Sequence, residues 1–94
     1  MTSRATRLET VLRRDFAPAL LEVVDDSAHH AGHAGARPEG ETHYAVLLVS
    51  ETFRGMNRLA RSRVVHAALA GEFALGMHAL TLTLRTPEEH ARSS

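Results

Sequence analysis

The sequence predicts a two-layer α+β domain in residues 1–94, with a mixed three-stranded β-sheet and helices on one face. Three observations support this fold class. An apolar run near the middle of the chain has no polar face, which is typical of a central strand. An amphipathic helical pattern opens the chain, and a second one separates the central run from a last strand of alternating polarity.

The first helix is predicted from Thr2 or Ser3, either of which is a suitable N-cap, to about Ala17. Pro18 disfavours helical geometry in the residue before it, so the helix has to end there. A first strand is predicted in residues 20–24. The apolar residues of the helix recur at helical spacing and are Ala5, Leu8, Val11, Leu12 and Phe16.

Residues 28–40 are predicted to form a loop between the first strand and the next, and these two strands are expected to pair antiparallel. The segment contains Gly32, Gly35, Pro38 and Gly40 and shows no apolar period. Connections of this length are commonly functional or disordered. We therefore expect a segment that is mobile in the free protein and becomes ordered in a complex.

Residues 41–50 are predicted to form the central strand. Tyr44, Val46 and Leu48 share one face with Thr42, and the other face carries Ala45, Leu47 and Val49. A strand that is apolar on both faces needs a neighbouring strand on each side.

A turn at residues 51–55 and a cap at Asn57 predict a second helical segment, which could be broken near Ala60 and is closed by Gly76. Its predicted buried stripe consists of Leu59, Val64, Val65, Ala68, Leu69 and Phe73. The last strand is predicted in residues 77–84, and a short capped helix from Thr86 precedes a frayed tail in residues 91–94. A right-handed crossover makes this strand parallel to the central one.

The parity of the last strand separates two sets of side chains. Leu80, Leu82 and Leu84 are expected in the core with His78, whereas Thr81 and Thr83 face water. The pattern alone therefore favours a half-buried structural role for His78.

The composition excludes several classes of protein. There is no cysteine, so disulfides, thiol nucleophiles and thiolate metal sites are excluded, and any metal rests on histidine or carboxylate. No catalytic triad, paired-carboxylate or phosphate-loop pattern is present, and we expect no enzyme. The chain start does not resemble a signal peptide and no apolar run is long enough to span a membrane, so the expected location is the cytoplasm.

All eleven basic residues are arginine, and eleven acidic residues balance them to a formal charge of zero. This balance argues against a purely electrostatic nucleic-acid binder. One local group could still contact phosphates, and it consists of Arg54, Arg58, Arg61 and Arg63.

Histidine is the compositional exception, with seven residues in the chain. His29, His30 and His33 lie close together in the loop, where they suit either a solvated tract or a metal-binding arm. Their spacing fits zinc, nickel or copper as well as iron. His43 is expected near His78 at the same end of the sheet, in a structural role.

The order and spacing of several blocks resemble those of BolA proteins over nearly the whole chain. These blocks are Asp26-Ser27 with a histidine-bearing loop, Glu41-Thr42-His43-Tyr44, Val49-Ser50, Phe53-Arg54-Gly55, Arg61-Ser62-Arg63-Val64-Val65, Met77-His78-Ala79-Leu80 and Thr86-Pro87-Glu88-Glu89. The resemblance implies a type II KH-like fold of order α-β-β-α-α-β, which agrees with the predicted elements.

The resemblance also implies a non-enzymatic partner of a monothiol glutaredoxin, in a heterodimer that shares a [2Fe-2S] cluster and serves iron–sulfur cluster trafficking or iron homeostasis. In such complexes the glutaredoxin cysteine and glutathione supply sulfur. The BolA partner supplies a histidine near the start of its last strand, which matches His78, and a second ligand from the loop. Counting forward from Ser27 places that ligand at His30, and counting back from His43 places it at His33, with His29 behind both. The isolated protein is expected to be a monomer without the cluster.

Two features depart from the family pattern. Arg61-Ser62-Arg63 stands where many members have Arg-His-Arg, and the Gly-x-x-Gly loop of KH domains is absent between the helices. The alternative function is a KH-like DNA-binding transcriptional regulator. The four arginines from Arg54 to Arg63 would then contact phosphates, whereas in a glutaredoxin complex they would meet glutathione or an acidic surface.

Overall fold

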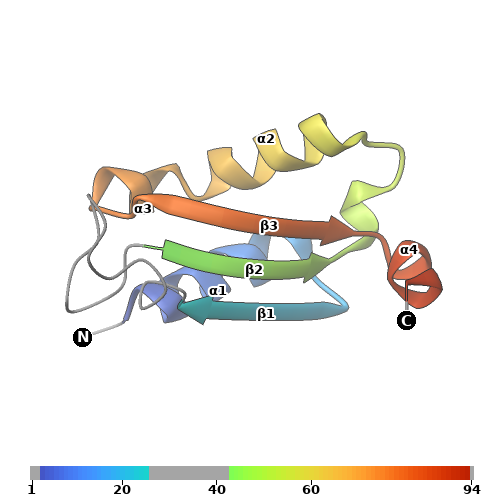
Figure 1. Cartoon of the computed structure of the whole chain (residues 1–94), viewed down its shortest axis with the longest axis horizontal. Helices are drawn as coiled ribbons and strands as arrows, with labels where there is room; N and C mark the ends of the chain where they lie inside the picture. Colours follow the sequence, from blue (N-terminus) through green and yellow to red (C-terminus); the bar gives the residue numbers. More distant parts are fainter. Residues whose placement is uncertain (1–2, 26–42, 94) are drawn as a thin grey trace.

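Strand β2 (His43–Val49) lies at the centre of a three-stranded sheet, as predicted (Figure 1). The computed structural model describes residues 3–25 and 43–93. Strand β1 (Leu20–Asp25) pairs antiparallel with β2, and β3 (Ala79–Arg85) pairs with β2 in parallel. This mixed sheet confirms the predicted fold class. The predicted loop at residues 28–40, with its three histidines, lies outside the described residues.

Helical segments precede, separate and follow the strands. They are α1 (Arg4–Phe16), the 3₁₀ turn η2 (Glu51–Phe53), α2 (Arg58–Ala68), α3 (Ala70–Ala74) and α4 (Pro87–Arg92). Figure 1 shows α1 behind the sheet, α2 running alongside β3, and α4 at the opposite end of the sheet from α3. Residues 91 and 92, which were expected in a frayed tail, lie in α4.

The core lies between the helices and one face of the sheet. Tyr44, Val46 and Leu48 of β2 are all buried and share one strand parity, so this face is the one that the helices cover. The other buried members of the same hydrophobic cluster are Leu8, Leu12, Phe16, Phe53, Val65, Leu69 and Met77. Leu80, Leu82 and Leu84 pack against this cluster while Thr81 and Thr83 are exposed, which confirms the predicted parity of β3.

Helix α1 begins and ends as its sequence predicts. The Ser3 hydroxyl oxygen accepts a hydrogen bond from the Thr6 N–H at 3.2 Å, which makes Ser3 the N-cap. At the other end Ala17 adopts the left-handed conformation with φ 43°, directly before Pro18. This turn leads the chain into β1.

The second helical segment differs from its prediction in two respects. The break lies at Leu69 and not near Ala60, because Asn57 accepts a hydrogen bond from the Ala60 N–H at 2.8 Å and the first turn is intact. Leu59 was predicted to be buried and is 58% exposed. It lies six positions before the buried Val65, which places it roughly 120° around the helix from the core.

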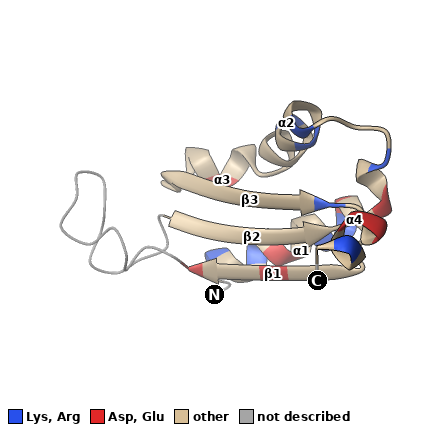
Figure 2. Cartoon of the chain, turned by 45° about the vertical axis from the view of Figure 1, so that its right-hand side comes forward, with Lys and Arg blue, Asp and Glu red and all other residues tan. Residues whose placement is uncertain are grey.

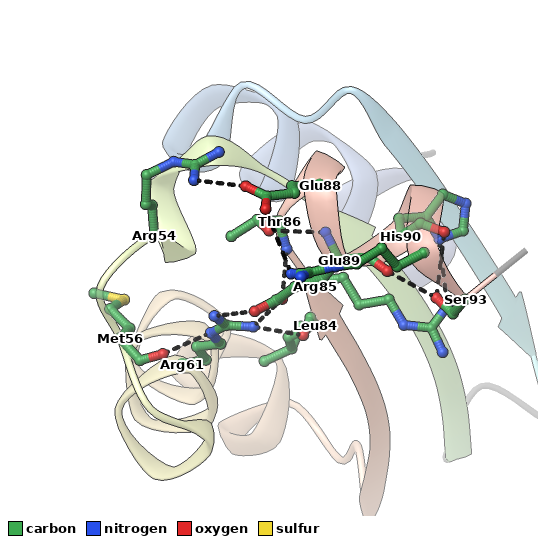
Figure 3. A network of polar contacts seen from close by, with 11 residues as sticks. Arg54, Met56, Arg61, Leu84, Arg85, Thr86, Glu88, Glu89, His90 and Ser93 are labelled. Atoms are coloured by element: carbon green, nitrogen blue, oxygen red, sulfur yellow. Dashed lines mark hydrogen bonds and ion pairs between the residues drawn. The ribbon is translucent and has the colours of Figure 1, made fainter.

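Helix α4 is fixed to the end of the sheet by ion pairs (Figure 3). Thr86 and Glu89 form a capping box, and Arg61 of α2 reaches the Glu89 carboxylate with two hydrogen bonds of 2.6 and 3.0 Å. Arg61 also donates to the main-chain oxygens of Met56 and Leu84. The bonds from Arg61 and from the Thr86 N–H lower the pKa of Glu89 to about 2.

Within the described residues, no helix is both long and apolar enough to cross a membrane.

We expect the two faces of β2 to differ sharply in their contribution to stability. Leu48→Ala empties a site with no exposed surface and should cost about 2–5 kcal/mol of unfolding free energy. Leu47→Ala, its neighbour on the open face, should cost less than half as much, since that side chain is only partly buried. Chemical denaturation of both variants measures this, and equal losses would contradict the assignment of faces.

The ion pair between Arg61 and Glu89 should make stability depend on pH. The folded-state pKa of Glu89 lies below its ordinary value of 4.5, so the pair contributes fully above that value. The contribution is lost as pH falls from about 4.5 towards about 2. Glu89→Gln keeps a side chain that can complete the capping box but removes the charge. The melting temperature of this variant should therefore fall less steeply than that of the wild type as the pH is lowered across this range.

The matched control for this measurement is Glu22→Gln, an exposed glutamate of β1. It removes one negative charge without touching the pair of Arg61 and Glu89, so the part of the pH dependence of melting that this pair supplies should remain. A Glu89→Gln profile parallel to the wild-type profile would show that the ion pair does not stabilise the fold.

Candidate functional site

Three segments of the chain meet at one end of the sheet. Strands β2 and β3 are parallel and both begin there, with His43 paired to Ala79. Strand β1 ends at the same place, with Asp25 paired to Tyr44. Residues 26–42 join Asp25 to His43, so the segment that carries the loop histidines both starts and returns at this end, beside His78.

A helix-terminating motif places His78. Gly76 has φ 111° and donates its N–H to the Phe73 oxygen at 3.2 Å, and the Met77 N–H bonds the Glu72 oxygen at 3.0 Å. These two bonds form a Schellman motif at the end of α3, and Met77 is buried within it. His78 follows and is exposed, because β3 begins only at Ala79. The half-buried position that strand parity predicted for His78 is therefore wrong.

Helix α3 is itself held by a buried ion-pair network with α1. The Nε of Arg4 contacts a Glu72 carboxylate oxygen at 3.0 Å, and the Nε of Arg7 contacts the other at 2.9 Å. Arg4 also donates to the main-chain oxygen of Leu75 at 2.8 Å. The bonds from Arg7 and then Arg4 lower the pKa of Glu72, so its carboxylate is ionised at neutral pH. The turn before His78 is thus tied to the start of the chain.

His43 lies next to His78, as the sequence predicted. The two ring centroids are 5.9 Å apart and the rings are inclined by 20°, a stacked arrangement. Imidazole nitrogen is a good ligand for iron, zinc and copper. Within the described residues there is no group of three side chains that could hold a metal ion. Ligands beyond the described residues would have to complete any metal site here.

The four arginines predicted as one patch do not act as a unit. Arg54 bonds Glu51, which lowers the pKa of that carboxyl, and also reaches Glu88 at 3.3 Å. Arg61 is paired with Glu89. Arg58 and Arg63 are exposed on α2.

These arginines also lie away from His78. Arg61 bonds the oxygen of Leu84 near the end of β3, whereas His78 lies before the first residue of this strand. Leu84 lies six positions after His78, which is about 20 Å along an extended strand. Figure 2 shows blue segments at the α4 end of β3, with its other end free of blue.

A groove between α2 and β3 was not predicted from the sequence. It has a volume of about 790 Å³ and combines leucines of β3 with basic residues of both elements. His66 lines it and stacks on Phe73, with ring centroids 5.5 Å apart. The groove has no sequence signal of its own, because its lining residues come from segments that lie apart in the sequence.

Comparison with known proteins agrees with the fold and with the sequence blocks. The BolA-like protein family model matches residues 12–89. The chain is 42% identical over 89 residues to chloroplastic protein BOLA1 of Arabidopsis thaliana, and this match covers 93% of the chain but 56% of that relative. The chain therefore spans little more than half the length of this relative.

Two further comparisons extend over most of both proteins. The DNA-binding transcriptional regulator BolA of Escherichia coli is 42% identical over 83 residues, which cover 88% of this chain and 75% of the regulator. The solved structure of BolA1 from Arabidopsis thaliana superposes with a TM-score of 0.84 at 40% identity, covering 95% of this chain and 97% of that one. The chain belongs to the BolA-like protein family.

Proposed function

We propose that this protein is a non-enzymatic partner of a monothiol glutaredoxin and co-ligates a [2Fe-2S] cluster through His78, in iron–sulfur cluster trafficking or iron homeostasis. The observation that carries the proposal is the position of His78. It is exposed at the end of the sheet where residues 26–42, with His30 and His33, start and return. Membership of the BolA-like family adds support.

The residues of this chain fit a shared cluster better than a resident one. The chain has no cysteine, so it contributes nitrogen ligands while the glutaredoxin cysteine and glutathione contribute sulfur. Replacement of thiolate by histidine at one iron of a [2Fe-2S] centre raises its reduction potential. His78 is the first ligand, and His30 or His33 is the second.

His43 has a positioning role in this proposal. Its ring lies almost parallel to that of His78 at 5.9 Å, and flat stacking limits the rotation of the exposed imidazole. A ligand held in this way loses less conformational entropy when it binds a metal. His43 is therefore assigned to orienting His78 and not to coordination.

DNA binding is the second candidate function. The Escherichia coli relative is named a DNA-binding transcriptional regulator, and Arg58 and Arg63 are exposed on one helix. The affinity for duplex DNA would fall steeply with salt. The logarithm of the binding constant decreases with the logarithm of the salt concentration, with a slope of about −0.9 for each phosphate contacted. Formation of a cluster-bridged heterodimer would instead depend on iron and glutathione. Titration at two salt concentrations distinguishes the two functions.

We expect His78→Ala to abolish the visible spectrum of the mixed complex. Glutaredoxin, glutathione, iron and sulfide are combined with each variant, and absorbance and circular dichroism are recorded. The wild-type protein should change the spectrum of the glutaredoxin cluster because imidazole replaces thiolate. One of His30→Ala and His33→Ala should weaken the cluster, and the other should leave it unchanged.

His66→Ala is the matched control, since His66 is also exposed but lies on α2. It should retain the full spectrum. Far-ultraviolet circular dichroism checks that each variant is folded, and gel filtration without iron checks apo-complex formation. A folded His78→Ala protein with the wild-type cluster spectrum would return His78 to a structural role.

A further inference from the structure

Strand β3 is an edge strand, and its outer main-chain groups point into the groove beside α2. The Arg85 oxygen accepts the Ser50 N–H at 2.9 Å, so it points towards the β2 side. The Leu84 oxygen accepts from Arg61 of α2, so it points the other way. Main-chain groups alternate along a strand, so those of Leu80 and Leu82 also face α2.

These outward groups are available for pairing. In the part of the chain that the structure describes, no hydrogen bond from another element reaches the N–H or C=O of Leu80 or Leu82. Arg61 occupies only the Leu84 oxygen at the far end of the strand. An unpaired edge of this kind is a template for a further strand.

The groove beside this edge is suited to a peptide in size and in polarity. Its volume of about 790 Å³ lies within the range of about 300–1,000 Å³ that is usual for ligand pockets. Leu80, Leu82 and Leu84 supply apolar surface on the sheet side. Polar and charged side chains line the rest, mainly Arg58, Arg61, Ser62, His66, Arg85 and Glu89.

The charge of the groove is unbalanced. Glu89 is the one acidic residue among the described lining residues, and it is already paired with Arg61. Arg58 has no ion pair with any described residue, and Arg85 contacts the His90 Nδ1 at 3.3 Å. Among the residues that the structure describes, Arg58 and Arg85 therefore lack a carboxylate partner, and they lie one on each wall of the groove.

We propose that this groove binds an extended acidic segment of a partner protein by β-strand addition to β3. The main chain of the segment pairs with Leu80 and Leu82. Alternate side chains of an added strand point to one face, so apolar residues pack on the leucines while acidic residues meet Arg58 and Arg85. The site lies along the strand and is distinct from His78 at its start.

A nucleic-acid strand fits the same surface less well. Single-stranded binding sites stack bases on aromatic side chains, and no Phe, Tyr or Trp is present among the described lining residues. Arg61 is already committed to Glu89, which leaves little basic charge for a phosphate backbone. Bases and phosphates also do not provide the regular alternation of main-chain donors and acceptors that an open strand edge pairs with.

The test uses an acetylated, amidated peptide of four Glu-Val repeats and the ¹⁵N-labelled protein. Titration should shift the amide signals of Leu80, Leu82 and Leu84 and slow the hydrogen exchange of Leu80 and Leu82. Two isomers, N-methylated on all valines or on all glutamates, should behave differently. One should lose binding and the other retain it, because only alternate amides face β3.

Arg58→Glu should weaken binding of the peptide roughly tenfold. Arg63→Glu is the matched control, since it makes the same charge change on the exposed surface of the same helix but does not line the groove. Its affinity should be that of the wild type. Circular dichroism confirms that both variants are folded.

Four outcomes would overturn the proposal. They are an absence of shifts at a peptide concentration of about 2 mM, equal binding by both N-methylated isomers, equal losses in the two arginine variants, and tighter binding of an oligothymidine at the same amides. The last result would assign the groove to nucleic acid.

Discussion

The carboxylate of Glu72 is the group on which the arrangement of the functional end depends. It is 9% exposed and is held by Arg7 and by Arg4, which is 8% exposed. A buried carboxylate is tolerated only when it is paired and hydrogen-bonded, and removal of one partner leaves a costly uncompensated charge. The pairing fixes α3 against α1, and the Schellman motif at the end of α3 then directs Met77 inward and His78 outward. Arg4 and Arg7, in the first turn of α1, therefore help to position His78, more than seventy residues later in the sequence.

This arrangement separates two surfaces along one strand. His78 lies before β3 at the end where residues 26–42 attach, and the groove follows the outer edge of the same strand towards α4. The ion pair between Arg61 and Glu89 closes the far end of the groove and occupies the Leu84 oxygen. A cluster-bearing partner at one end and an extended segment along the edge would thus contact different residues. Simultaneous binding is compatible with this geometry.

Local patterns predicted most of the fold, because each element carries its own signal. The apolar faces of β2, the caps at Ser3, Asn57 and Thr86, and the glycine after α3 are short-range features. The helix break was predicted near Ala60 and lies at Leu69, and the pairing of Glu72 with α1 was not predicted. Contacts between residues 65 and 68 positions apart, such as those of Glu72, leave no periodic trace in a single sequence. The groove and the pairing of Arg61 with Glu89, 28 positions apart, were missed for the same reason. The approach of His43 to His78, in contrast, followed from the parallel pairing of β2 and β3.

The most direct test of the central claim is to detect which atom of this protein binds the cluster. Protein labelled with ¹⁵N only in histidine is assembled with glutaredoxin, glutathione and a [2Fe-2S] cluster, which is then reduced and studied by electron–nuclear double resonance. We expect hyperfine coupling from ¹⁵N in the wild-type complex and a loss of one coupled nitrogen in His78→Ala. A reduced cluster that shows no ¹⁵N coupling in the wild-type complex would contradict histidine ligation by this protein.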